Sequence, residues 1–123
     1  MVGRYALLMA LLPQLAFAQG LGCIEPGVTG GGQICDRSTT ITSGNTSQTA
    51  LAANSRRIYC EIQPLAADAW IAINHSAAAN TAGSFLVPAN SLFRCPVNTA
   101  PTGPINILGA TAGASYTAIE VQR

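Results

Sequence analysis

The residues whose chemistry is easiest to infer are four cysteines, Cys23, Cys35, Cys60 and Cys95. An even number of cysteines behind an export signal indicates disulfides. Three pairings are possible. We favour Cys23–Cys35, which brackets a glycine-rich stretch, and Cys60–Cys95, which would join two strand-like segments. Zinc is the competing interpretation, but zinc sites use cysteine pairs only about two to four residues apart, far closer than these.

The other reactive side chains form no recognisable catalytic motif. His75 is the only histidine and has no partner at a fixed spacing, and no G-x-S-x-G motif occurs. The glycines at 30–32 lack the Lys-Ser/Thr of a phosphate loop. The acids are scattered, and we expect them at strand edges and turns: Glu25, Asp36, Glu61, Asp68 and Glu120. A carboxylate pair formed in space is the alternative. We therefore expect no enzyme, catalytic residue, metal or cofactor.

Aromatic side chains are the remaining candidates for a binding site. Trp70 is the only tryptophan, and an exposed group of Trp70, Tyr59 and Tyr116 could stack on a sugar ring. We expect Trp70 to pack in or beside the core. We expect one edge of the Tyr59 ring to be exposed to solvent, because the charged residues Arg57 and Glu61 share its strand face. Trp70 and Tyr59 are the candidate contacts for a ligand or partner.

The first 18 residues resemble a secretory signal. Arg4 precedes an apolar stretch, and Ala16-Phe17-Ala18 fits a signal-peptidase site that would leave Gln19 as the new N-terminus. An uncleaved anchor and a lipoprotein modified at Cys23 are the alternatives. Cleavage predicts a periplasmic or extracellular protein without membrane attachment.

Short strand-like runs must position these residues. After the signal (1–18) we expect a glycine-rich arm or loop (19–37) and one domain (38–123). The clearest strand is 56–63, with Ile58, Cys60 and Ile62 on one face and Arg57, Tyr59 and Glu61 on the other. Further strands are predicted at 38–43, 48–52, 69–73, 84–87, 91–95, 105–108 and 115–121. This pattern predicts an all-β protein, an antiparallel β-sandwich or jelly-roll-like barrel of about eight short strands stapled by disulfides.

The chain carries few charges. Charged residues make up 9% of it, all six basic residues are arginines, and removal of Arg4 with the signal leaves a net charge near zero. Nucleic-acid binding and polybasic membrane binding both need positive surfaces, so this composition argues against them. Low net charge favours association instead.

Four segments resemble a family of small β-rich proteins of tailed phages and prophages. They are TITSGNTSQTALAANSRRIYCEIQ (39–63), AWIAIN (69–74), TAGSFLVPANSLFRC (81–95) and PTGPINILGATAGASYTAIE (101–120). The resemblance implies a β-sandwich that serves in the virion as a capsid decoration or as a head- or tail-fibre-associated module, and it implies no catalytic residue. The signal peptide and the four cysteines depart from the family pattern, and both point to an oxidising destination.

Two functions follow as expectations. The first is a non-enzymatic structural or interaction module, a phage-derived virion component whose partners are proteins in a repeating assembly, including further copies of itself. The alternative is a secreted or periplasmic module that binds glycans or another cell-surface ligand through Trp70 and Tyr59.

Overall fold

The computed structural model describes residues 23–24, 32–96 and 99–123, which form ten β-strands. The strands are β1 (Cys23–Ile24), β2 (Gln33–Asp36), β3 (Thr39–Thr40), β4 (Gln48–Leu51), β5 (Arg57–Pro64), β6 (Ala69–Ile73), β7 (Ser84–Val87), β8 (Phe93–Arg94), β9 (Ile105–Gly109) and β10 (Ser115–Gln122). In these ranges no helix is long and apolar enough to cross a membrane.

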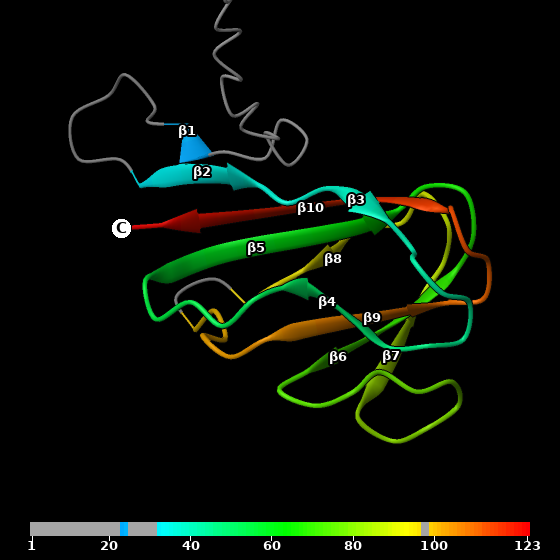
Figure 1. The fold of residues 1–123 in the computed structure, drawn as a ribbon. Helices are drawn as coiled ribbons and strands as arrows, with labels where there is room; N and C mark the ends of the chain where they lie inside the picture. Colours follow the sequence, from blue (N-terminus) through cyan, green and yellow to red (C-terminus); the bar gives the residue numbers. More distant parts are fainter. Residues whose placement is uncertain (1–22, 25–31, 97–98) are drawn as a thin grey trace, which may run out of the picture.

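The strands form two antiparallel sheets. The six-stranded sheet has the order β1-β2-β10-β5-β8, and β3 also pairs with β10. The four-stranded sheet has the order β4-β9-β6-β7. Figure 1 shows β10 and β5 in one layer and β9 and β6 in the other. The predicted all-β antiparallel sandwich is confirmed.

The core lies between the sheets and is built by period-two alternation along each strand. In β6, Ala69 and Ile71 face the core, while Trp70 and Ala72 face outward. The six-stranded sheet contributes several fully buried side chains, and β4, β6 and β9 contribute the rest. The largest of these are Leu51, Ile62, Ile71, Ile105, Ile107 and Tyr116.

Both predicted disulfides are confirmed, and none of the four cysteines is free. Cys23 and Cys35 are directly opposed in the β1–β2 pair. Cys60 lies on the buried face of β5, and Cys95 follows β8, the neighbouring strand, at a Cα–Cα distance of 5.2 Å. The second bridge therefore sits in the core, whereas the first ties a two-residue strand to the sheet edge.

A β-bulge in β5 overturns the predicted position of Arg57. Val121 of β10 pairs with Tyr59, but the next residue, Gln122, pairs with Arg57, so that Ile58 is an extra residue in β5. A bulge of this kind breaks the alternation of faces. The expectation that Arg57 shares an outer face with Tyr59 is wrong: Arg57 is buried.

The expected N-terminal arm is partly a strand of the sheet. Gln33–Asp36 pairs with β10 over four residues, and Cys35 is fully buried. Cys35 is buried between the more exposed Ile34 and Asp36, which suits a strand with one covered face. The predicted signal peptide and the glycine run at 30–32 lie outside the described residues or at their border, where only Gly32 is described.

We expect the two bridges to contribute unequally to stability. The closed loops span 12 and 35 residues, which correspond to about 3 and about 4 kcal/mol of loop entropy. Cys60→Ala/Cys95→Ala also removes buried sulfur from the core, so it should lower the thermal midpoint more than Cys23→Ala/Cys35→Ala. Calorimetry of both double variants tests this, and equal midpoints would contradict it.

Candidate functional site

A buried ion pair lies on the inward face of the six-stranded sheet, at one end of the sandwich. The Arg57 Nε donates to Glu120 Oε2 at 2.8 Å, and both side chains are almost fully buried. Arg57 Nη1 donates to the carbonyls of Pro101 (2.7 Å) and Gly103 (2.9 Å), and Nη2 donates to the carbonyl of Ala52. Four of the five guanidinium N–H groups are therefore used. The charge of Arg57 is balanced, and its donors tie the chain before β9 and the chain after β4 to β5.

The position of Glu120 corrects a second expectation. Glu120 was expected at a strand edge or turn, but it lies on the inward face of β10, and its Oε1 is also 3.5 Å from Arg37 Nε. The other described acids do sit on partly exposed positions and make local contacts. Asp36 accepts from the backbone of Ser38, and Asp68 from that of Ala89. Glu25 is outside the described residues.

An open cleft of about 620 Å³ lies beside this ion pair. It runs between β4, at the edge of the four-stranded sheet, and β10 with β3, in the six-stranded sheet. Its walls are hydroxyls, carboxamides, small apolar side chains and one ion pair, from Arg37, Thr39, Thr49, Ala50, Ala52, Ala53, Asn54, Glu120 and Gln122. This lining offers hydrogen bonds and no unbalanced charge beyond Arg37.

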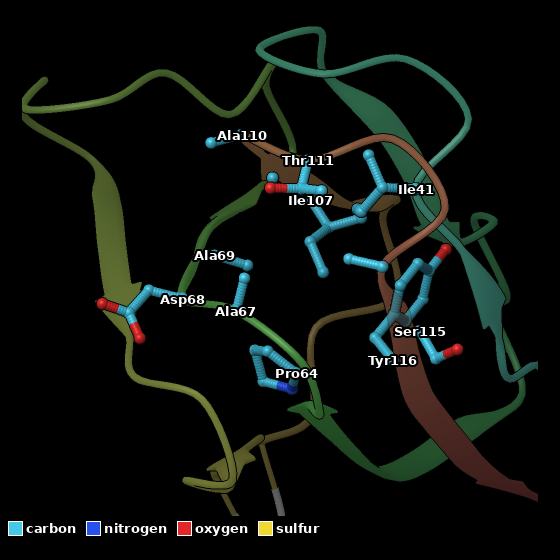
Figure 2. Close-up of a pocket in the computed structure, with 12 residues that line it drawn as sticks. Ile41, Pro64, Ala67, Asp68, Ala69, Ile107, Ala110, Thr111, Ser115 and Tyr116 are labelled. Carbon is cyan, nitrogen blue, oxygen red and sulfur yellow. The ribbon is translucent and has the colours of Figure 1, made fainter.

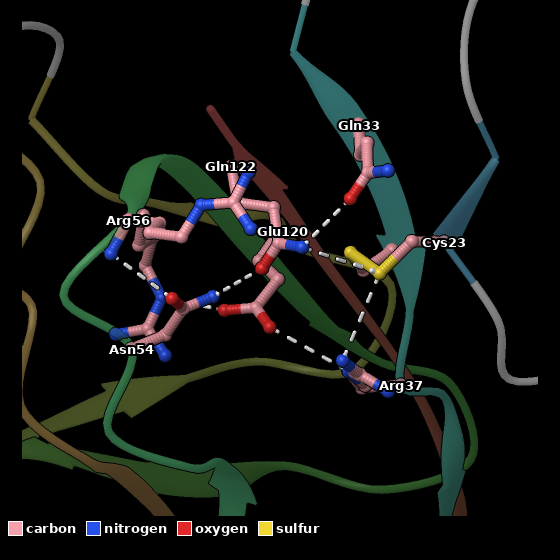
Figure 3. The surroundings of a disulfide bond; sticks show 9 residues. Cys23, Gln33, Arg37, Asn54, Arg56, Glu120 and Gln122 are labelled. Carbon is pink, nitrogen blue, oxygen red and sulfur yellow. Dashed lines mark hydrogen bonds and ion pairs between the residues drawn. A yellow bond between two sulfur atoms is a disulfide. The ribbon is translucent and has the colours of Figure 1, made fainter.

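Hydrogen bonds connect the cleft to the exposed disulfide (Figure 3). Asn54 Nδ2 donates to Gln122 Oε1 at 2.8 Å, and Gln122 Nε2 donates to Gln33 Oε1 at 2.9 Å. Gln122 Nε2 also lies 3.8 Å from Cys23 Sγ, and Arg37 Nη2 lies 3.9 Å from the same sulfur. Arg37 thus touches both the buried carboxylate and the disulfide.

The structure separates the three aromatic candidates. Tyr116 is buried in the core, and its hydroxyl accepts from Gln48 at 3.2 Å. Trp70 lies half-buried on the outer face of the four-stranded sheet, between Leu86 and Leu108 of its neighbouring strands. It packs beside a small outer cluster of Ala72, Ala77 and Leu108, separate from the main core. Tyr59 lies in β5 of the other sheet, so the three rings share no face.

Tyr59 and Glu61 form an outward-facing pair in β5. The Tyr59 hydroxyl donates to Glu61 Oε2 at 2.6 Å, and this hydrogen bond, together with the Glu61 charge, raises the pKa of Tyr59. Arg94 of β8 lies 3.8 Å from the same carboxylate oxygen. Tyr59 is partly exposed, as expected, but it is engaged with its neighbours rather than with a second aromatic ring.

The strongest exposed apolar feature is the outer edge of the four-stranded sheet. Phe85 and Leu86 of edge strand β7 are 54% and 50% exposed, on opposite faces of the strand. Phe85 meets Phe93 of β8, which is the edge strand of the other sheet, with ring centroids 6.3 Å apart. No Asp, Glu, Lys or Arg occurs between Asp68 and Arg94. Sequence patterning overlooked this edge, although that uncharged run was a visible signal.

A second hollow is too small to hold a ligand (Figure 2). Its volume is about 10 Å³, and its walls include Ile41, Pro64, Ile107 and Tyr116. That space would hold about one water molecule. It is a packing gap at the end of the core.

The described residues contain no group of three His, Cys, Asp or Glu side chains that could hold a metal ion. His75 is exposed, as predicted for a loop histidine, and its Nδ1 lies 2.9 Å from the Ser76 carbonyl. All buried side-chain nitrogens and oxygens in the same part of the chain have hydrogen-bond partners. The absence of enzymatic activity stays a prediction.

We predict that Arg57→Leu is strongly destabilising, because it leaves the Glu120 charge without its buried partner. The expected loss is roughly 3–5 kcal/mol. Arg57→Leu/Glu120→Leu should lose less than the sum of the single variants. The exposed neighbour offers a matched control: Arg56→Leu should change stability by less than about 0.5 kcal/mol. Urea unfolding of these three variants and of Glu120→Leu measures these values, and additive losses would argue against coupling.

Burial raises the pKa of the Tyr116 phenol above its ordinary value. The phenol therefore loses its proton at a lower pH in the unfolded chain than in the folded one. Its contribution to the free energy of unfolding is complete below a pH of about 10 and is lost as the pH rises towards the folded-state pKa. We expect Tyr116→Phe to lose stability less steeply above that pH than the parent chain. Unfolding curves across the alkaline range test this, and parallel slopes would contradict it.

No protein-family description matches this sequence, and no curated protein matches it. Among solved structures, the chain is similar to protein NMB1881 from Neisseria meningitidis, with 11% identity, 83% of this chain and 82% of that chain covered, and a TM-score of 0.44. It is also similar to an RmlC-like cupin protein from Desulfovibrio desulfuricans, with 14% identity, 99% and 96% coverage and a TM-score of 0.47. These values are too low to transfer an activity or a binding site.

Proposed function

We propose that this protein is a non-enzymatic interaction module that packs against further copies of itself in a repeating assembly. The observation that supports this proposal is the position of β7 at the edge of its sheet, with about half of the Phe85 and Leu86 side chains exposed on its two faces. Natural edge strands are normally protected by charges, bulges or covering segments. Here the only protective features among the described residues are the short length of β7 and Pro88 after it.

A second copy is the partner that best suits this edge. An antiparallel edge strand can pair with its own copy about a two-fold axis, so the same surface serves both partners. The segment between Asp68 and Arg94 has no charged residue, so two copies would meet without like-charge repulsion. Main-chain hydrogen bonds would supply the pairing, and Phe85 and Leu86 would supply the apolar contact.

The energetics favour an assembly of many copies over an isolated dimer. Burying the exposed half of each of these two side chains gains on the order of 1 kcal/mol, or on the order of 4 kcal/mol for both copies together. Association costs at least about 4 kcal/mol in lost translational and rotational freedom. The main-chain hydrogen bonds of the paired edges add roughly 1 kcal/mol each. One such contact is therefore weak, but it becomes effective where other contacts already hold copies side by side.

The resemblance to tailed-phage proteins implies that this module serves in the virion, as a capsid decoration or as a head- or tail-fibre-associated protein. Such a role requires many identical copies on a lattice, which suits weak repeated contacts. Proteomics of purified particles from an induced host tests this form. Consistent absence from the particles would remove the virion role and leave the self-association to be tested separately.

Sedimentation of the full chain tests the contact itself. We expect reversible association at about 0.1–1 mM, the range of a weak interface. Phe85→Lys/Leu86→Lys should abolish it, because burying a lysine without a partner is costly. Ile34→Lys is a matched control, since Ile34 is 43% exposed on β2, in the other sheet. A parent chain that stays monomeric, or equal effects of the control, would overturn the proposal.

A further inference from the structure

We propose that the Cys23–Cys35 disulfide is a thiol–disulfide exchange site, at which a low-molecular-weight thiol forms a mixed disulfide with Cys23. The proposal rests on the exposure of this bridge and on the guanidinium and amide groups around it, and it is independent of the self-association through β7. The second disulfide of the chain, Cys60–Cys95, serves as an internal comparison.

Access distinguishes the two bridges. Cys23 is exposed, whereas its partner Cys35 is fully buried. In the other bridge both sulfurs are enclosed, with Cys60 and Cys95 at 0% and 2% exposure. Exchange requires a thiolate to reach one sulfur of the disulfide. Cys23 is therefore the only one of the four cysteines at which an external thiolate can react without opening the fold.

The positive charge near Cys23 favours the approach of an anionic thiolate to Cys23 Sγ and the later release of Cys23 as a thiolate. Arg37 Nη2 lies 3.9 Å from Cys23 Sγ, and Figure 3 shows Arg37 directed toward both this sulfur and Glu120. The Glu120 carboxylate is shared between Arg37 and Arg57, so the three groups together keep one positive charge. Asp36 follows Cys35 in β2 and points to the opposite face of the strand. Its carboxylate accepts a hydrogen bond from the backbone of Ser38. Positive surroundings of this kind stabilise thiolates.

The exchange balances as two substitutions. A thiolate RS⁻ attacks Cys23 Sγ, the bond to Cys35 breaks, and the electron pair leaves on Cys35 Sγ, which takes a proton from water. A second RS⁻ then attacks the R-side sulfur of the mixed disulfide, forming RSSR and releasing Cys23 as a thiolate beside Arg37. Two external thiols are oxidised, and one protein disulfide is reduced to two thiols.

Reduction would also loosen one edge of the sheet. β1 pairs with β2 through only two residue pairs, Cys23↔Cys35 and Ile24↔Ile34. Without the covalent bond, only the main-chain pairing of two residues would hold β1 to the edge of β2, and a pairing that short adds little stability. The outer edge of β2 would then become available for another strand, whereas the core bridge and both sheets stay in place.

The experiment treats the oxidised full chain with reduced glutathione, traps free thiols by alkylation, and maps them by mass spectrometry. We expect a glutathione adduct on Cys23 alone and reduction of Cys23–Cys35 while Cys60–Cys95 remains intact. Equal reduction rates of the two bridges, or an adduct on Cys35, would overturn the proposal.

Charge variants test the role of Arg37 as a positioning residue. Arg37→Gln should slow the second substitution, in which Cys23 leaves as a thiolate beside Arg37, about threefold, because the leaving thiolate loses its neighbouring positive charge. Arg37→Lys keeps the charge and should retain most of the rate, and the exposed Arg56→Gln should match the parent. Thermal unfolding of each variant verifies that the fold is unchanged. An unchanged rate in folded Arg37→Gln would remove the proposed electrostatic assistance.

Discussion

The buried Arg57–Glu120 pair is the constraint on which one end of the sandwich depends. A buried charge is tolerable only with a partner and a full set of hydrogen bonds. Glu120 therefore needs Arg57, and Arg57 in turn needs the carbonyls of Ala52, Pro101 and Gly103. These contacts join β5 and β10 of one sheet to the connections that enter β9 and leave β4 in the other. The β-bulge in β5 is the local distortion that makes the pairing possible.

Opposite kinds of surface result at the two sides of the sandwich. Beside the ion pair, β4 and β10 leave an open cleft lined by carboxamides, hydroxyls and Arg37. At the other side, β7 and β8 end the two sheets, and Phe85 and Phe93 meet between them. The first side offers hydrogen bonds and an exposed disulfide, and the second offers an apolar strand edge. The few charges are unevenly placed: Arg37 and the Arg57–Glu120 pair lie at or beside the cleft, while β7 itself carries no charged residue.

Much of the fold could be predicted from residue patterns. The strands at 69–73 and 84–87 have the expected bounds, because apolar runs bounded by turn residues define them locally. The favoured disulfide pairing is also the observed one: Cys23 and Cys35 bracket one glycine-rich stretch, and Cys60 and Cys95 lie in two strand-like segments. The burial of Arg57 and Glu120 was not predictable, because strict alternation placed Arg57 outside. The β7 edge was missed because strand order in a sheet depends on pairings between distant segments.

The sequence by itself determined the all-β class, the approximate strands, the presence of four cysteines suited to disulfides, and the low charge. These properties are encoded within short stretches, through alternation, turn residues and composition. Only the tertiary structure decided that β5 carries a bulge, that Glu120 lies between two arginines, that Cys23 is exposed beside Arg37, and that β7 ends its sheet. Each of these depends on which distant strands pair and in which register, and such long-range choices are settled by packing the whole chain rather than by any local pattern.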